Sequence, residues 1–316
     1  MKDKKREMER YEKVLRLSRS AIYDRINGKV PVSLDEAHSL LQAFDLSWNA
    51  LLEDTARVAS QYDSGILLTR SVETAPEAYM AALYEDTLLL SKSPTARTWH
   101  ECGAIPVFML LHNPLLASFK FYFWFKTFHA HHNGESFPRF SARWADNARI
   151  RALLQHSAVT LKAYQSIGGV EIWSRNMFDR ILTRIQYIRE MDGFEDPSMA
   201  TRLAEELLAL SRHMERMARM GRKTPEAHGA PMEVYENRIF SFHSTLTGSS
   251  SEHQFLHIDL GYPDFIRYTS ADLVQERILR YGPMLRHTEP VTHSERACNV
   301  FFKELNEHVT HQMQTC

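Results

Sequence analysis

The chain has 316 residues, a length that allows a well-buried core and more than one domain. Its composition, 44% hydrophobic and 24% charged, is typical of a folded globular protein and excludes a disordered chain. The formal net charge of −1 excludes a polycation, but DNA binding depends on where the charges lie. Three widely separated cysteines and a charged N-terminus without an apolar core predict a reduced, cytoplasmic protein without a signal peptide.

The N-terminal region is locally basic. Residues 1–30 contain ten Lys or Arg against five Asp or Glu, whereas residues 31–55 contain five acidic residues and no Lys or Arg. This split indicates a small domain with one basic and one acidic surface.

Residues 6–55 are predicted to form four short helices joined by tight turns. In the second helix Ile22 and Ile26 lie on one face, Ser18 is the N-cap, and Gly28 ends the helix. A capping box in the sequence Ser-Leu-Asp-Glu at 33–36 begins the third helix, and a serine at position 47 caps the fourth.

The first two helices have the layout of a helix-turn-helix DNA reader. A supporting helix over residues 6–15 precedes a turn at Arg16-Leu17 and a second helix over residues 18–27, whose first side chains would reach the major groove. A plain pair of amphipathic helices is the alternative. The candidate DNA-binding residues are the polar or exposed positions of the second helix and its stop: Ser18, Arg19, Ser20, Tyr23, Asp24, Arg25, Asn27 and Lys29.

The stretch "LRLSRSAIYDRINGKVPVSLDEAHSLLQAFDLSWNALL" resembles the Cro/C1-type (XRE) helix-turn-helix family of bacterial and phage regulators. The resemblance covers about the first 55 residues. It implies a recognition helix over residues 18–26, with Arg19, Ser20 and Tyr23 as base-reading candidates and Lys29 as a phosphate contact.

The sequence departs from the family pattern at three places. The first helix of the family is missing or shortened here, and Arg16 stands in the turn where the family usually has Gly. A non-glycine residue such as Arg16 is strained at this position if the turn requires a positive φ. Arg25-Ile26 replaces the usual Ile-Glu, which predicts an inward face shifted by one residue.

The larger part of the chain is predicted to be helical, after a connector at 56–75. Predicted helices cover residues 76–91, 113–128, 142–165, 171–190, 197–221 and 294–313. A heptad seam within 203–217 favours a helical bundle, and the alternating segment 253–262 is a candidate strand. A resemblance of "AIPVFMLLHNPLLASFKFYFWFK" to the uncharacterised C-terminal region of certain such regulators implies only an effector or oligomerisation domain.

A metal-dependent enzyme is a weaker alternative. His257 and Asp259 form half of a facial triad, with His253 on the same strand face and His287 or His293 as a distal ligand. The sequence "HAHH" offers a second cluster: His129, His131 and His132. Phosphate-loop, dinucleotide-binding and nucleophile-elbow motifs are absent from the sequence.

These observations predict a mainly α protein with a helix-turn-helix domain at 1–55, a linker at 56–75 and a helical bundle-like domain at 76–316, containing at most a few short strands. The predicted function is sequence-specific transcription regulation by a homodimer that binds double-stranded DNA. An unidentified small-molecule effector is the other expected partner. Neither a membrane, a cofactor, a metal nor a catalytic residue is predicted. The second hypothesis is a non-catalytic scaffold protein with a degenerate helix-turn-helix.

Overall fold

The structure is a computed structural model of the chain. It describes residues 2–44, 66–67, 74–129, 137–226, 228–241, 243–261 and 264–315. Contacts divide the chain into two compact units, Met1–Asp63 and Ser64–Cys316.

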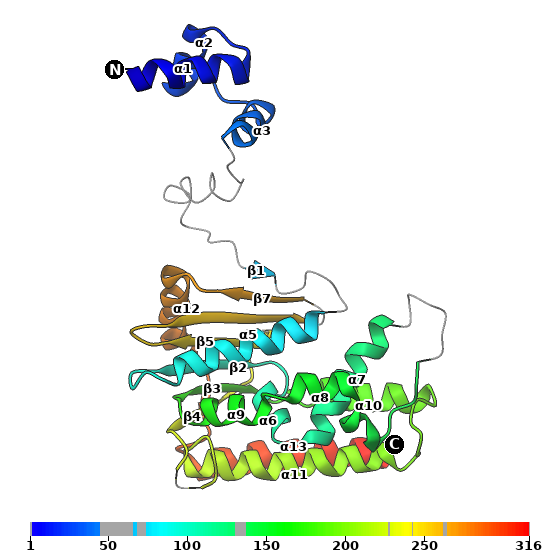
Figure 1. Ribbon diagram of the computed structural model, residues 1–316. Coiled ribbons are helices and arrows are strands. Elements are labelled where there is room, and N and C mark those ends of the chain that lie inside the picture. The colour runs from blue at the N-terminus through cyan, green and yellow to red at the C-terminus, as the bar shows by residue number, and fades with distance from the viewer. Residues whose placement is uncertain are drawn as a thin grey trace. The chain divides into compact units, whose positions relative to one another are not determined.

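The N-terminal unit contains three described helices, shown in blue in Figure 1: α1 (Lys2–Leu15), α2 (Arg19–Ile26) and α3 (Leu34–Ala43). The side chain of Ser18 accepts the N–H of Ala21 at the start of α2, and Ser33 and Glu36 form a reciprocal capping box at the start of α3. Both predicted caps are confirmed. The predicted helix after residue 47 lies outside the described residues.

A small apolar core joins these three helices. Ile22 and Leu41 are almost completely buried, and the rings of Tyr11 and Phe44 lie 5.3 Å apart between their centroids. Arg10 extends this contact, because its guanidinium lies 4.4 Å from the Phe44 ring centroid and donates to the carbonyl of α3's last residue at 2.7 Å. Packing therefore fixes α1 against α3. The short turns before and after α2 connect it to these two helices.

The C-terminal unit is built around a mixed β-sheet, so the predicted mainly α, bundle-like fold is wrong. The strands lie in the order β1-β7-β6-β5-β2-β3-β4-β8. Their bounds are β1 Ile66–Leu67, β2 Arg97–Cys102, β3 Gly168–Ser174, β4 Met232–Asn237, β5 Thr245–Ser249, β6 Gln254–Gly261, β7 Asp264–Tyr268 and β8 Glu289–Pro290.

The sheet combines a parallel half and an antiparallel half. β2, β3 and β4 are parallel neighbours, whereas β5, β6 and β7 follow on the other side of β2 as an antiparallel meander. The chain thus extends the sheet from β2 in one direction and later returns to extend it in the other. β2, β3, β4 and β6 therefore run in the same direction, and their carboxyl ends lie at the same end of the sheet.

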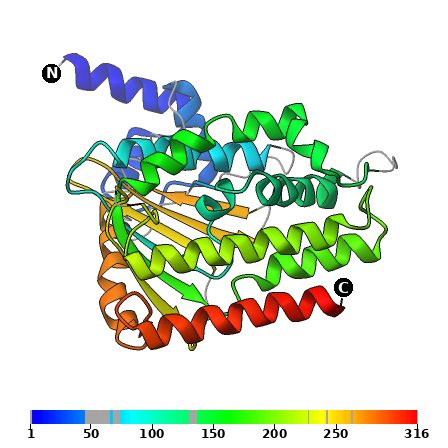
Figure 2. The same cartoon turned by 90° about the horizontal axis from the view of Figure 1, so that it is seen from below.

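Helices cover both faces of the sheet (Figures 1 and 2). Their bounds are α5 Ala75–Leu90, α6 Val107–Leu111, α7 Pro114–His129, the 3-10 helix η1 Ala142–Asp146, α8 Ala148–Leu154, α9 Ser157–Gln165, α10 Asp179–Glu190, α11 Met199–Met220, α12 Ala271–Leu285 and α13 Glu295–Thr315. α12 packs through Tyr281 on the face that carries Val170 and Ile172 of β3. In both views α11 and α13 run side by side, and their apolar residues belong to the largest core cluster.

Three of the predicted helices have the bounds expected from their periodicity, as α5, α7 and α11 show. The heptad residues within 203–217 are buried in the core of this unit. The candidate strand at 253–262 is confirmed as β6, and the predicted helix at 294–313 as α13.

Two predicted helices are wrong. The segment 142–165 divides into η1, α8 and α9, and the segment 171–190 contains most of β3 before α10 begins. The reason is visible in β2 and β3, where His100, Glu101 and Glu171 are buried. Polar residues at core positions break the continuous apolar run that identifies a buried parallel strand in a sequence.

None of the described helices is both long enough and apolar enough to cross a membrane.

Candidate functional site

The turn between α1 and α2 has an unusual backbone conformation. Arg16 has φ = 52°, in the left-handed region, which confirms the positive φ expected at this turn position. Two residues later Ser18 adopts an extended conformation and its hydroxyl accepts the N–H of Ala21 at 3.4 Å. This pair of local features redirects the chain sharply and starts α2 at Arg19.

Six of the eight candidate DNA-binding residues lie at exposed positions of the second helix and its stop: Ser18, Arg19, Ser20, Tyr23, Asn27 and Lys29. Arg19 forms a two-pronged ion pair with Glu12 of α1, at 3.0 and 3.1 Å. The ammonium of Lys29 lies 3.5 Å from the Asp24 carboxylate. An exposed single contact such as that of Lys29 stabilises a protein by only about 0–1 kcal/mol, so Lys29 can exchange Asp24 for phosphate at low cost.

Arg25 has a different role from the other candidates. Its guanidinium binds Glu36 of α3 at 2.8–3.1 Å and also donates to the carbonyl of Ala21. These charge-assisted bonds to Glu36 raise the pKa of Arg25 and lower the pKa of Glu36. Arg25 therefore joins α2 to α3.

The predicted inner face of α2 needs a correction. Ile22 is buried, but Ile26 is 61% exposed and does not share the inner face with it. α2 keeps position 25 inside and position 26 outside, and Arg25 is accommodated because Glu36 neutralises it. The expected one-residue shift of the inner face does not occur.

In the C-terminal unit, a cavity of about 590 Å³ opens at the carboxyl ends of β3 and β4. Its lining comes from the segments after the two strands and from α13: Ser174, Arg175, Asn176, Asp179, Asn237, Arg238, Ile239, Phe240, Ser241, Glu304 and His308. Loops at the carboxyl ends of parallel strands are the usual position of ligand sites in α/β proteins. The volume falls in the range of small-molecule pockets.

The wall of this cavity is a network of paired charges. Arg175 and Arg238 both bind the buried carboxylate of Glu236, at 2.6 and 2.9 Å. Burial alone would raise the pKa of Glu236, but hydrogen bonds from Arg238 and Arg175 lower it below its ordinary value. Across the cavity His308 lies 3.0 Å from Asp179. Donors and acceptors of both charges therefore line a space suited to a polar ligand.

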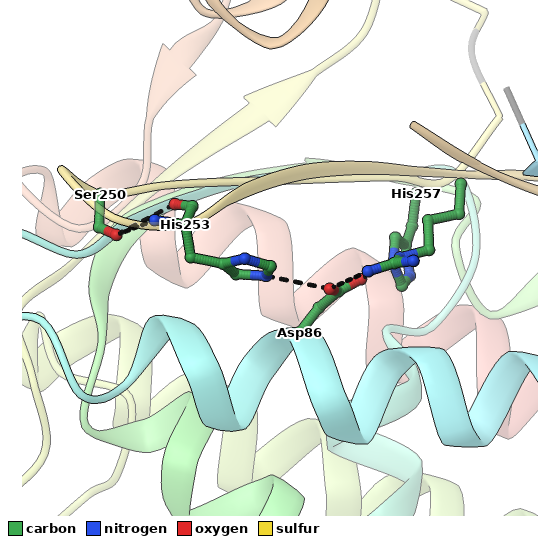
Figure 3. A network of polar contacts seen from close by, with 5 residues as sticks. Asp86, Ser250, His253 and His257 are labelled. Atoms are coloured by element: carbon green, nitrogen blue, oxygen red, sulfur yellow. Dashed lines mark hydrogen bonds and ion pairs between the residues drawn. The ribbon is translucent and has the colours of Figure 1, made fainter. Parts of the chain in front are cut away.

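His257 and Asp259 do not assemble the predicted facial triad. His257 hydrogen-bonds through Nε2 to Asp86 of α5 at 2.6 Å, and His253 binds the other oxygen of Asp86 at 3.0 Å (Figure 3). Arg267 of β7 donates to both oxygens of Asp86, each at 2.7 Å. The Asp86 carboxylate is thus the centre of a hydrogen-bonded network.

The other candidate metal ligands can be compared only where the structure describes them. Among the described residues the one group of three close His, Cys, Asp or Glu ligand atoms consists of His100, Cys102 and Glu171, within 4.8 Å of one another. His287 and His293 do not belong to it. Of the "HAHH" cluster, the second and third histidines lie outside the described residues.

Glu171 is at the centre of a second buried network. Its two oxygens accept hydrogen bonds from the hydroxyl of Tyr164 and, at 2.7 Å, from Nε1 of Trp173. The ammonium of Lys223 donates to Thr98 at 2.8 Å and lies 3.4 Å from the Tyr164 ring centroid. Both oxygens of Glu171 are thus hydrogen-bonded within the core, whereas the buried Nδ1 of His100 has no hydrogen-bond partner among the described residues.

Burial sets the proton affinities in this network. It lowers the pKa of Lys223 to about 7, although the charge of Glu171 opposes the shift. It also lowers the pKa of His100 to about 3 and raises the pKa of the Cys102 thiol, so His100 is neutral and Cys102 is protonated near pH 7.

The cavity and both buried networks were not predicted from the sequence. Arg175 and Arg238 follow two strands that were not predicted, and Asp86 meets residues more than 160 positions later in the chain. One signal was available, because Ser-Arg-Asn at 174–176 and Asn-Arg at 237–238 each follow a short run rich in β-branched and aromatic residues.

No protein-family model, no curated protein and no solved structure matches this chain.

Proposed function

We propose that this protein is a sequence-specific DNA-binding transcriptional regulator, with α1 and α2 as its helix-turn-helix. The observation that carries the proposal is that Arg19, Ser20 and Tyr23 are exposed at the start of α2, which begins three residues after the left-handed turn residue Arg16. In a helix-turn-helix the second helix presents its first side chains to base edges while the first helix supports it. Arg19, Ser20 and Tyr23 would read bases, and Lys29 would bind a phosphate.

The electrostatics of α2 support this assignment. Lys29 holds a single exposed contact with Asp24, Arg19 holds a two-pronged pair with Glu12, and Arg25 holds a partly buried pair with Glu36. A DNA phosphate can displace Asp24 from Lys29 at low cost, because such exposed pairs contribute little free energy, whereas base reading by Arg19 requires exchange of its pair with Glu12. Arg25 instead stabilises the orientation of α2 and is a positioning residue in this proposal.

The C-terminal unit would supply dimerisation and effector binding. The cavity of about 590 Å³ at the ends of β3 and β4 has the volume and the mixed polar lining of a small-molecule site. A homodimer would place two copies of α2 in successive major grooves, about one helical turn apart.

The proposal is tested by the salt dependence of duplex affinity. Removing one phosphate contact reduces the slope of log K against log salt by about 0.9 for duplex DNA. Lys29→Ala is therefore expected to weaken binding to all sequences and to reduce the slope by about one. Arg19→Ala is expected to weaken binding most for the preferred sequence. Lys162→Gln, an exposed cation on α9, is the matched control.

If both N-terminal variants keep the affinity and the salt slope of the Lys162→Gln control, the proposed DNA interface is wrong.

A protein-interaction module is the second candidate, because the end of α2 and the segment after it expose apolar side chains. Their exposed fractions are Tyr23 50%, Ile26 61%, Val30 38% and Val32 46%. Exposed apolar patches mark interaction surfaces in folded proteins. Under this reading Ile26→Ser abolishes binding of a protein partner, whereas DNA binding is absent from the unmodified protein.

A further inference from the structure

A second hollow in the C-terminal unit lies near β2, where the parallel half of the sheet meets the antiparallel half. β2 has β3 on one side and β5 on the other, and the chain extends the sheet first through β3 and later through β5. Ala104, just beyond β2, donates to the hydroxyl of Ser244 at 3.2 Å, and Asp259 of β6 donates from its backbone to the carbonyl of Ser244 at 2.9 Å. The hollow therefore lies beyond the carboxyl end of β2, and in open α/β sheets ligands bind outside the carboxyl ends of the strands.

The hollow has a volume of about 40 Å³ and is lined by an excess of positive charge. Lys120 comes from α7, Arg180 and Arg184 come from α10, and Asp259 is the acidic residue of the lining. Three cations against one carboxylate leave a net charge of +2. The volume accommodates a single small group rather than a whole nucleotide.

Within the part of the chain that the structure describes, none of these three cations has a carboxylate within ion-pair distance. Lys120 instead lies 5.0 Å from the Trp124 ring centroid, and Arg184 lies 4.7 Å from that of Phe123. Asp259 accepts the backbone N–H of Gly261 at 2.8 Å. Aromatic faces hold Lys120 and Arg184, and the hydrogen-bonding capacity of these two cations remains available for a ligand.

The positive charge is not compensated in this arrangement. Burial lowers the pKa of Lys120 to about 8, with the charge of Asp259 opposing the shift and those of Arg184 and Arg180 adding to it. The pKa of Arg184 is also lowered, and burial is the main cause. Elsewhere in this unit, Arg175, Arg238, Arg267 and Arg277 each have a carboxylate partner.

We propose that this hollow binds a phosphate group, either as inorganic phosphate or as the phosphate of a small monoester. A phosphate dianion neutralises the net charge of +2, and arginine and lysine are the side chains that bind phosphate oxygens most strongly. The site is separate from the cavity at β3 and β4, although the segment from Ser174 to Ile181 contributes to both linings. The inference does not depend on DNA binding.

The test is a calorimetric titration of the full-length protein at constant ionic strength. Inorganic phosphate and methyl phosphate are titrated separately. Arg184→Gln and Lys120→Gln are each expected to weaken phosphate binding about tenfold or more, since each removes a charge-assisted hydrogen bond. Asp259→Asn is expected to tighten binding, because it removes the opposing charge. Arg151→Gln and Lys162→Gln, exposed cations on α8 and α9, are matched controls.

Tighter binding of methyl phosphate than of inorganic phosphate identifies a monoester ligand, and the reverse order identifies the free ion; both support the site. Thermal melting of each variant in a chloride buffer without phosphate establishes that it is folded. If Arg184→Gln does not melt cooperatively, Arg180→Gln replaces it, because that side chain is exposed. Absence of phosphate binding at millimolar concentration, equal binding by site and control variants, or acetate binding as tight as phosphate binding overturns the proposal.

Discussion

The buried carboxylate of Asp86 provides the sharpest stability prediction, for the substitution Asp86→Asn. Asp86 is completely buried and accepts four hydrogen bonds, two from Arg267 and one each from His253 and His257. Asparagine keeps the volume of the side chain but removes its negative charge. The guanidinium of Arg267, which is 22% exposed, then faces a neutral amide.

The expected loss follows from the burial of this ion pair. Removing one partner of a buried pair costs about 3–5 kcal/mol, because the other charge stays in a poorly hydrated place. Since Arg267 retains some contact with water, we expect a value near the lower limit, about 3 kcal/mol. Glu276→Gln is the matched control, because its pair with Arg280 on α12 is more than half exposed, and it is expected to cost less than about 0.5 kcal/mol.

The assay is urea unfolding of the full chain near pH 7 and at decreasing pH. Burial opposes ionisation of Asp86, but hydrogen bonds from His257 and Arg267 dominate and lower its pKa in the folded protein. A depressed folded-state pKa contributes stability that is complete above the unfolded value of about 3.9 and decreases as the pH falls below it. The difference between unmodified protein and Asp86→Asn should therefore begin to shrink as the pH falls below about 4 and continue to shrink toward the lower folded-state pKa.

A free energy of unfolding for Asp86→Asn within 1 kcal/mol of that of Glu276→Gln, or a difference that stays constant down to about pH 3, would refute this reasoning.

Two further predictions concern the backbone. Arg16→Gly should stabilise the N-terminal unit by about 1 kcal/mol, because glycine avoids the strain of φ = 52°, and should slow amide exchange in α2 about fivefold. Asp192→Gly, which relieves a similar φ of 49° in the other unit, should leave that exchange unchanged; equal effects of both variants would contradict the prediction. Gly169→Ala should destabilise the C-terminal unit by about 1–3 kcal/mol, because a Cβ there would lie 2.4 Å from the backbone oxygen of Thr98. Gly168→Ala, whose nearest contact is 3.5 Å away, should keep the urea midpoint of the unmodified protein, and an equal loss in both variants would count against the argument.

The N-terminal unit could be predicted well because its signals are local. The Ser18 cap, the capping box of Ser33 and Glu36 and the left-handed residue at position 16 each depend on a few neighbouring residues. The position of Ile26 could not be predicted, because it depends on Arg25 finding Glu36 eleven residues away.

The C-terminal sheet escaped prediction because its central strands bury polar side chains. β2 reads Arg-Thr-Trp-His-Glu-Cys, and its buried Glu101 is paired with Arg277 of α12, 176 positions later. Where partners are so distant, a short strand with alternating apolar and charged residues resembles an exposed segment. The same distances explain why the hollow at Lys120 and Arg184 has no sequence signature, and why the cavity at Arg175 and Arg238 has only the local one of polar residues after two short β-rich runs.

The most direct test of the proposed function is selection of bound duplexes from a random DNA pool by the full-length protein. The account predicts enrichment of a palindrome whose half-sites lie about one helical turn apart, as expected for a dimer that presents two copies of α2. It also predicts that Arg19→Ala loses the preference at one position of each half-site. A pool that remains random after repeated selection, or an enriched sequence that Arg19→Ala and Lys29→Ala bind as well as the unmodified protein, would contradict the account.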